Sequence, residues 1–233
     1  MVKQIDFSTL MASTVHDMKN VIAAVSQAYE SLLAEMPEAL QRSPQARLIE
    51  QEALRLDAML MQLLGLYKLE HGQLSLQSVY YSVEELFEDL HNRHREVLEY
   101  RNIDLQIELD DPDLEAYLDV SLMGTVLDNA LGNALNFCKK TIRLAAQRDG
   151  DGVLLSICDD GPGYPESLLG AVRSSQSSGI DRDSGSTGLG LYFAANIVAM
   201  HDQESRPARL ELNNDGPLSG ACMKIWIGLP SLF

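Results

Sequence analysis

The chain has few cysteines, few basic residues and no long apolar run. Its three cysteines, Cys138, Cys158 and Cys222, are scattered and lack a CxxC spacing, so we expect free, buried thiols in a reducing compartment, the cytoplasm. No stretch of about 18 apolar residues occurs, which argues against membrane insertion, and residues 1–7 lack the apolar core of a signal peptide. Only 18 basic residues face 34 acidic ones, and the formal net charge of -16 disfavours nucleic acid as a partner.

A heptad pattern marks the N-terminal region. Apolar residues alternate by four and three positions between residues 8 and 36 and again between residues 49 and 67, with Pro37 at the start of a short connection. Two such helices are expected to be antiparallel neighbours. One hairpin cannot cover both apolar seams, whereas a four-helix bundle of two identical chains can. We therefore expect residues 1–72 to form a dimeric helical bundle; the alternative is a hairpin that packs on its own second domain.

Residues 73–233 mix both kinds of periodicity and predict an α+β domain in which three helices cover an antiparallel-rich sheet. The expected strands are 74–76, 103–109, 114–118, 141–146, 153–158, 209–212 and 221–229, and the expected helices are 83–101, 121–137 and 190–201. Ser121 is the predicted N-cap of the middle helix. Residues 166–187, rich in Ser, Gly and Asp, predict a mobile loop.

Two glycine-rich segments predict a phosphate site. Asp159-Asp160-Gly161-Pro162-Gly163 follows an apolar strand, and Gly185–Leu191 opens a helix. Glycine turns allow backbone N–H groups to approach phosphate oxygens, and a helix N-terminus favours anions. The Asp159 carboxylate, at the head of its turn, can accept a hydrogen bond from an adenine amine.

An asparagine pair lies between the heptads and these turns. Asn129 and Asn133 are four residues apart on one face of an otherwise apolar helix, where asparagine is a weak helix former. Side-chain amide oxygens can hold Mg²⁺, which keeps several waters and takes few protein ligands. The alternative is a solvated helix surface.

His16 is a candidate nucleophile on the first helix. Asp17 follows it and can fix the tautomer of the ring, and Asn20 lies one turn further on the same face, where its amide could position a water. The alternative for these residues is a polar helix surface. The pair His91 and His94 has metal-ligand spacing but polar neighbours, and a metal site is set aside there. His71 and His201 are also expected on the surface.

Together these motifs resemble those of the two-component sensor histidine kinases, over residues 6–229. His16–Asn20 resembles the H box, Asp128–Phe137 the N box, Asp159–Gly163 the G1 box and Gly185–Leu191 the G2 box. The resemblance implies a Bergerat-type α/β sandwich, the GHKL type of ATP-binding domain, behind the dimerisation hairpin.

The resemblance also implies roles for individual residues. His16 would be phosphorylated, with Asp17 as its activating acid, and Asp17 with Asn20 matches the family's phosphatase motif. ATP and Mg²⁺ would be held by Asn129, Asn133, Phe137, Asp159, Gly161, Gly163, Thr187, Gly188, Leu189 and Gly190. Within that set, Asn133 would bind the metal, Asp159 would read the adenine, and the glycines near residue 190 would wrap the phosphates as part of a lid.

The chain departs from the family pattern in three places. Asn136 replaces the usual basic residue of the N box, the Phe-x-Pro-Phe pattern between the two glycine boxes is absent, and 15 residues precede His16. We therefore expect a short lid, and input from a separate sensor or input protein or from the catalytic core itself.

The predicted function is that of a cytoplasmic, homodimeric autokinase in a phosphorelay. ATP would phosphorylate His16, and the phosphoryl group would pass to an aspartate of a separate response regulator receiver domain, which the protein could also dephosphorylate. One alternative is a dimeric histidine phosphotransfer hub that does not use ATP. Another is a serine kinase or other ATPase that shares the nucleotide fold.

Overall fold

A computed structural model describes residues 7–41, 43–173, 189–203 and 206–230 of the chain. The chain divides into two compact units, Met1–Ser75 and Leu76–Phe233. Within the described residues, no helix has both the length and the apolar character that crossing a membrane requires.

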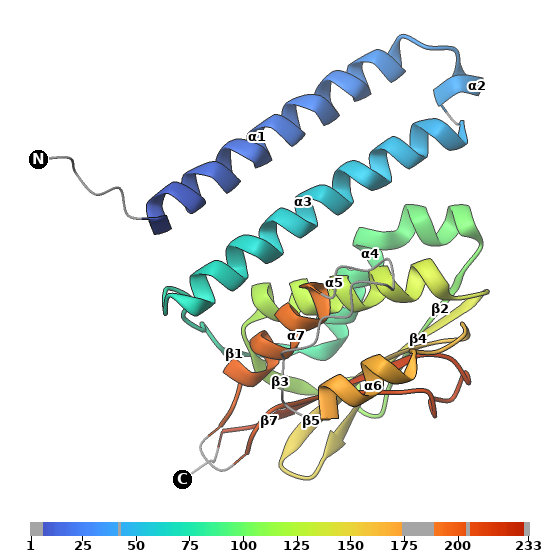
Figure 1. Cartoon of the computed structure of the whole chain (residues 1–233). Coiled ribbons are helices and arrows are strands. Elements are labelled where there is room, and N and C mark those ends of the chain that lie inside the picture. The colour runs from blue at the N-terminus through green and yellow to red at the C-terminus, as the bar shows by residue number, and fades with distance from the viewer. Residues whose placement is uncertain (1–6, 42, 174–188, 204–205, 231–233) are drawn as a thin grey trace, which may run out of the picture. The chain divides into compact units, whose positions relative to one another are not determined.

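The first unit is a helical hairpin. Helices α1 (Phe7–Ala34) and α3 (Pro44–Glu70) lie side by side and antiparallel, and the short helix α2 (Glu38–Gln41) lies in their connection (Figure 1). Ser43 caps α3, since its hydroxyl accepts the Ala46 N–H at 3.2 Å. After α3, Gly72 has a φ of 64°, which suits glycine at a helix end. The predicted hairpin is therefore confirmed.

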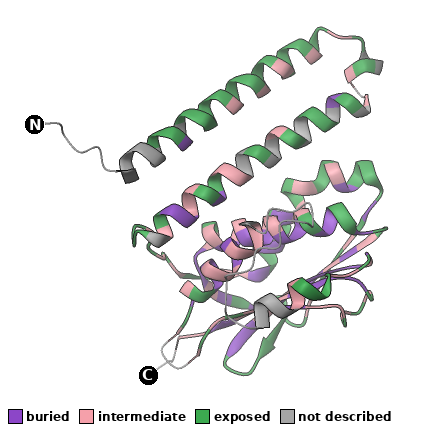
Figure 2. Ribbon diagram, in the orientation of Figure 1, coloured by how far each residue is buried: buried purple, intermediate pink, exposed green. Residues whose placement is uncertain are grey.

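The apolar seam of α1 is covered on one side only. Three of its residues spaced by seven positions, Val15, Ile22 and Tyr29, are buried or half-buried, and Met36, just after the helix, continues the series. The other half of the heptad is exposed, with Met18 at 49%, Val25 at 59% and Leu32 at 52% of full accessibility (Figure 2).

Helix α3 shows the same division. Ala53, Leu60 and Tyr67 are buried or half-buried, whereas Ile49, Leu56 and Leu63 are 48%, 50% and 39% exposed. A single hairpin thus covers half of each seam, as the heptad pattern predicted.

The second unit is built on a five-stranded mixed sheet of order β2-β4-β5-β7-β6. Its strands are β2 (Asp104–Leu109), β4 (Thr141–Asp149), β5 (Gly152–Asp159), β6 (Arg209–Asn213) and β7 (Cys222–Gly228). Strands β2 and β4 are parallel and the other pairs are antiparallel. A separate antiparallel pair is formed by β1 (Val79–Ser82) and β3 (Glu115–Leu118).

Three helices form the second layer of this unit. Helices α4 (Val83–Arg101), α5 (Val120–Phe137) and α7 (Leu189–Met200) lie together over one face of the sheet (Figure 1). The core between the layers contains fully buried side chains from both, among them Leu127, Leu131, Leu144, Leu155, Ile197 and Ile225. Alternating burial along β4, β5 and β7 shows that the sheet buries this face preferentially. The predicted α+β sandwich is confirmed.

Three local predictions were wrong. Residues 74–76 form no strand, and the first strand is β1, further along the chain. Helix α5 is capped by Asp119, whose Oδ1 accepts the Leu122 N–H at 3.0 Å, and not by Ser121. The predicted loop begins with a helix, α6 (Glu166–Arg173), while its later part, residues 174–188, lies outside the described residues.

The prediction of three free thiols was also wrong. Cys158 of β5 and Cys222 of β7 are direct partners in the antiparallel ladder, with Cα atoms 4.0 Å apart, and they form a disulfide. Cys138 is free and buried. The two bonded cysteines are separated by 64 positions, so only the strand pairing brings them together.

Candidate functional site

Asp159 ends β5 and is almost fully buried, at 4% exposure. Its Oδ1 accepts the N–H groups of Gly161 at 2.7 Å and Ala221 at 3.4 Å, and its own N–H donates to the Ala221 carbonyl at 2.9 Å. Among the described residues, both hydrogen bonds to the carboxylate use Oδ1, which leaves Oδ2 as an acceptor for a ligand. Burial raises the pKa of Asp159, and the two backbone N–H groups offset this only in part.

The neighbouring Asp160 has a different environment. Its carboxylate accepts the N–H groups of Lys139 and Lys140 at 2.7 and 3.1 Å. Burial alone would raise the pKa of Asp160, but these backbone donors outweigh it, and the pKa is lowered. Asp160 therefore ties the turn after β5 to the segment that follows α5.

The two glycines of the turn have no room for a side chain. A Cβ on Gly161 would lie 2.6 Å from the carbonyl oxygen of Phe137. Gly163 has a φ of +86°, and a Cβ there would lie 2.8 Å from Cγ of Asn214. The absence of side chains therefore lets Gly161 lie against the C-terminal end of α5 and Gly163 against Asn214.

Two asparagines on one face of α5, Asn129 and Asn133, form a stripe that ends near this turn. Asn129, Asn133 and Phe137 follow one another at intervals of four residues, with Asn129 half-buried, Asn133 exposed and Phe137 59% exposed. The opposite face of α5 is buried in the core. An exposed carboxamide at Asn133 suits a hard cation that keeps most of its water, so the residue fits a Mg²⁺ ligand.

Helix α7 packs beside α5 and begins at Leu189. Gly190 lies in its first turn and is half-buried. The predicted site residues Thr187 and Gly188 lie outside the described residues, and the side chain of Leu189 is not described.

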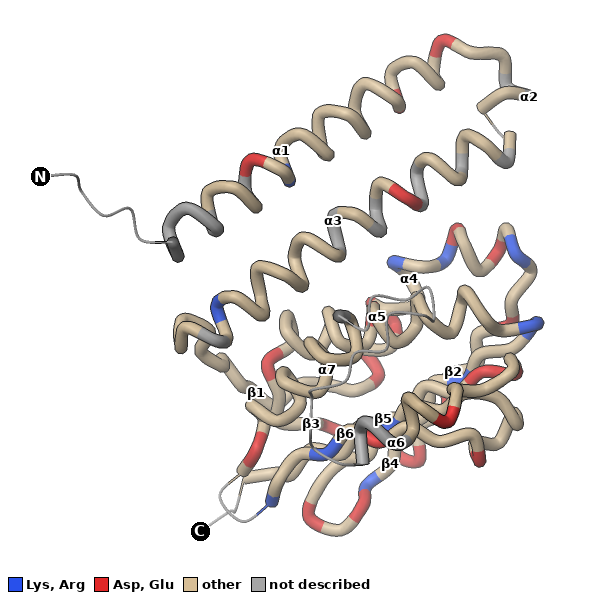
Figure 3. The backbone as a smooth tube through the Cα atoms, viewed as in Figure 1, with Lys and Arg blue, Asp and Glu red and all other residues tan. Residues whose placement is uncertain are grey.

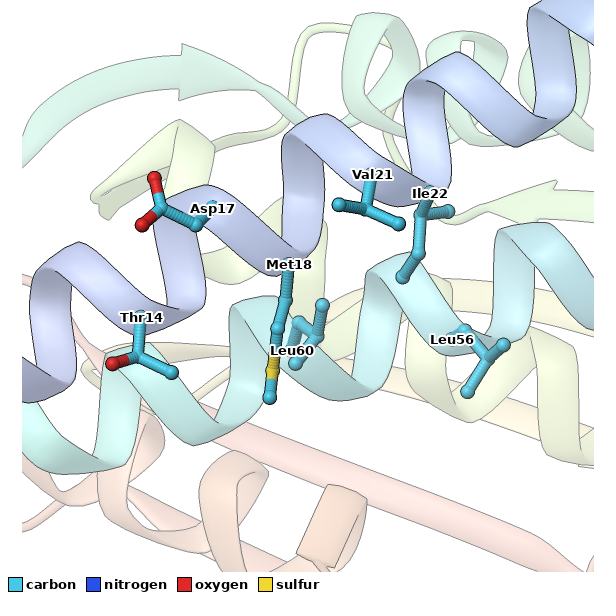
Figure 4. A pocket seen from close by; sticks show the side chains of 7 residues that line it. All are labelled: Thr14, Asp17, Met18, Val21, Ile22, Leu56 and Leu60. Atoms are coloured by element: carbon cyan, nitrogen blue, oxygen red, sulfur yellow. The ribbon is translucent and has the colours of Figure 1, made fainter.

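The H-box residues belong to the other unit. His16, Asp17 and Asn20 lie on α1; the side chain of His16 is not described, and those of Asp17 and Asn20 are exposed. Asp17 borders a largely apolar groove of about 430 Å³ between α1 and α3 (Figure 4). Its lining residues are Thr14, Asp17, Met18, Val21, Ile22, Leu56 and Leu60.

Sequence reasoning missed the residues that support Asp159 from a distance. Ala221 bonds its carboxylate, and Asn214 bonds the backbone of Tyr164, which ends the same turn. No local motif marks them, because they come from the β6–β7 connection and approach through strand pairing.

Of the two histidines that were expected on the surface, His71 and His201, one is buried. His201 is buried at 1% exposure, so its predicted surface position was wrong. Its ring Nε2 accepts the Asp119 N–H at 3.0 Å, and Nδ1 donates to the Ile197 carbonyl at 2.8 Å. His94 donates from Nε2 to Asp128 at 3.0 Å, between α4 and α5.

Residues 118–231 match the family model described as the histidine kinase-, DNA gyrase B- and HSP90-like ATPase. Over 191 residues the chain is 30% identical to the alginate biosynthesis sensor protein KinB of Pseudomonas aeruginosa, an alignment that covers 80% of this chain and 32% of KinB. The chain therefore spans about a third of the length of that relative.

Solved structures share the fold. Full-length ShkA in complex with AMPPNP has a TM-score of 0.67 at 17% identity, over 96% of this chain and 47% of that one. The histidine kinase ThkA in complex with the response regulator protein TrrA has a TM-score of 0.58 at 20% identity, over 95% of this chain and 60% of that one.

Proposed function

We propose that the chain is a histidine kinase of a two-component system, an ATP-dependent autokinase that phosphorylates His16. The observation that supports this best is the buried Asp159 carboxylate at the head of a turn with no room for side chains. A fixed acceptor of this kind suits the exocyclic amine of adenine. The neighbouring asparagine stripe suits the metal-bound phosphates.

In this proposal the second unit binds Mg-ATP. Asp159 accepts the adenine amine through Oδ2, and Gly161 and Gly163 let the base approach the backbone. Asn133 holds Mg²⁺, which when bound neutralises phosphate charge. The family resemblance adds Asn129 and Phe137 from α5, and Thr187, Gly188, Leu189 and Gly190 as further nucleotide contacts, with the two glycines on the phosphates.

The reaction is an in-line phosphoryl transfer. A ring nitrogen of neutral His16 attacks the γ-phosphorus, an N–P bond forms, and the bond to the bridging oxygen of ADP breaks. Asp17 holds the ring in the tautomer whose attacking nitrogen has a free lone pair, and it stabilises the positive charge that develops on the ring. Positioning of the two reactants supplies most of the catalysis.

The partner that we propose is a response regulator receiver domain. An aspartate of that domain would take the phosphoryl group from His16. The solved complex of ThkA with TrrA supports a partner of this class, because its kinase chain shares the fold over most of this chain. Asp17 and the exposed amide of Asn20 could orient a water that hydrolyses the phosphorylated aspartate of the regulator and releases inorganic phosphate.

We also propose that the hairpin dimerises through its exposed seam. On each helix, one set of apolar residues spaced by seven positions is exposed. These residues are Met18, Val25 and Leu32 on α1, and Ile49, Leu56 and Leu63 on α3. The groove between the two helices is largely apolar. Helix α1 has three charged residues in 28, Asp17, Lys19 and Glu30, so its solvent side is poorly charged (Figure 3). Such a surface is typical of a face that a partner helix covers.

The decisive experiment uses the purified chain with γ-labelled ATP and Mg²⁺. We expect acid-labile, base-stable label on the wild-type chain, none on His16→Gln, and a strong loss on Asp159→Asn. Acid-stable label, or label that persists on His16→Gln, would move the acceptor to another residue. A chain that binds no ATP analogue but accepts phosphate from a phosphorylated regulator would be the phosphotransfer hub.

A further inference from the structure

The connection between β6 and β7 bonds the turn that begins at Asp159. Asn214, the first residue after β6, uses its whole amide for this: Oδ1 accepts the Tyr164 N–H at 2.7 Å, and Nδ2 donates to the Tyr164 carbonyl at 2.9 Å. The two bonds join segments 50 positions apart. One side chain therefore satisfies both backbone groups of the residue that ends the turn.

The far end of the same connection supports the start of the turn. Ala221 exchanges backbone and side-chain hydrogen bonds with Asp159, and Gly220 packs so closely that a Cβ there would lie 2.2 Å from the Asp159 carbonyl oxygen. In between, Gly216 lies against Cys222, since a Cβ there would be 2.8 Å from the Cβ of that residue. The connection is thus folded onto the turn at both ends.

The turn needs such support because of its composition. Gly161 and Gly163 have more backbone freedom than other residues and would sample many conformations without external bonds. Within the turn, the Gly161 N–H bonds Asp159, whereas Asn214 and Ala221 hold it from outside. Tyr164 completes the turn. Burial first, and then the negative charge of Asp159, raise the pKa of its phenol.

We propose that Asn214 is a positioning residue of the nucleotide site, which acts through Gly163 and Tyr164 to hold Asp159 in the orientation that reads the base. This inference rests on the proposed function. Asn214 does not touch the nucleotide in this proposal. Its loss should weaken recognition of adenine and leave the chemistry at the γ-phosphate unchanged.

Asn213 provides a matched control. It is the neighbouring asparagine and is half-buried like Asn214. Within the part of the chain that the structure describes, its amide bonds no residue of the turn, and its Oδ1 accepts the N–H of Asp215 at 3.2 Å. Asn213→Ala therefore removes the same chemical group next to Asn214 but leaves the hydrogen bonds to the turn after β5 intact.

The experiment measures displacement of a trinitrophenyl ATP analogue by ATP and by GTP on the full chain. We expect Asn214→Ala to lose about tenfold in ATP affinity, with little change for GTP, because the loss of a half-buried amide with two hydrogen bonds amounts to about one factor of ten. Asn213→Ala should stay within about twofold of wild type. In the kinase assay the KM for ATP should rise while kcat stays.

The pH profile gives a second readout. The backbone N–H groups of Gly161 and Ala221 favour the ionised form of Asp159. If Asn214→Ala loosens the turn, these bonds weaken and the loss of ATP affinity on acidification should begin at a higher pH than in wild type. A residue that only stabilised the fold would leave this profile unmoved.

The outcomes separate the two proposals. A wild-type chain that binds no nucleotide contradicts the proposed function itself. If the wild-type chain binds ATP, and the ratio of ATP affinity to GTP affinity is the same in Asn214→Ala and Asn213→Ala, the positioning role alone is contradicted. Should Asn214→Ala not fold, Asn214→Asp decides, because it keeps the size and the acceptor but loses the donated bond; an unchanged ratio relative to Asn213→Asp overturns the proposal.

Discussion

At the scale of single residues, His201 shows how packing sets a charge state. The ring accepts one backbone N–H and donates to one carbonyl, a pair of bonds that only the neutral imidazole can make. Burial lowers the pKa of His201 below the ordinary value of a histidine, while the Ile197 carbonyl and the Asp119 carboxylate oppose this in part. The folded state therefore disfavours the protonated ring.

We predict that the free energy of unfolding falls as the pH drops below about 6.5. The pKa of His201 is lower in the folded chain than in the unfolded chain, so the unfolded chain binds the proton first. The stability from the neutral ring is complete above the unfolded pKa and is lost as the pH falls through the folded pKa, with a slope of up to about 1.4 kcal/mol per pH unit. Urea denaturation at pH 7.5 and 5.5 measures it.

The His201→Gln variant should show a flatter dependence over this range, because it has no group to titrate there. An unchanged slope in His201→Gln would assign the titration to another residue.

Single residues also show where sequence reasoning reached its limit. The turn at Gly161 and Gly163 was predictable, because a strand followed by glycines is a local pattern, and the positive φ of Gly163 agrees with it. The burial of His201 and the role of Asn214 were not predictable, since both depend on neighbours 50 to 82 positions away.

At the scale of elements, the start of α5 distinguishes two capping residues. Asp119 caps the helix with Oδ1 and accepts the Gln77 N–H with Oδ2 at 2.9 Å, while Ser121 lies inside the helix and is exposed. We predict that Asp119→Ala lowers the free energy of unfolding by about 2 kcal/mol, since it removes a cap and a second hydrogen bond. Chemical denaturation of the full chain measures this.

Ser121→Ala is the matched control, because the sequence predicted Ser121 as the N-cap of this helix. It should change stability by less than about 0.5 kcal/mol, or raise it slightly, because alanine is the better helix former. Equal losses in the two variants would contradict the assignment of Asp119 as the cap.

Elements with strong periodicity were predicted well, and short or irregular ones were not. The heptads gave both long helices, and alternation together with the Asp-Gly turn gave the β4–β5 hairpin. The strand expected at 74–76 is absent because its alternation spans too few residues to decide a pairing. Helix α6 was missed, since the serine- and glycine-rich residues after it dominated the composition of the segment.

At the scale of the whole molecule, the exposed heptad positions test the proposed dimer. A glutamate at Val25 and at Leu56 would bring charge into an apolar interface, where each buried side chain contributes about 1.5–3 kcal/mol. We predict that Val25→Glu combined with Leu56→Glu weakens association at least about a hundredfold. Sedimentation equilibrium over a range of concentrations measures the change.

Gln27→Glu serves as the control, because Gln27 is exposed and lies two positions, more than half a turn, from Val25. It should leave association as in wild type. A monomeric wild-type chain, or a double variant that still dimerises, would favour packing of the hairpin on another surface.

The half-covered seams have a consequence for how the chain unfolds. If a second copy supplies the missing cover, the hairpin draws part of its stability from mass action, and its melting temperature should climb with protein concentration. The sandwich encloses its own core and should melt at a temperature independent of dilution. The protein concentration in the sample would then decide whether the hairpin or the sandwich unfolds at the lower temperature.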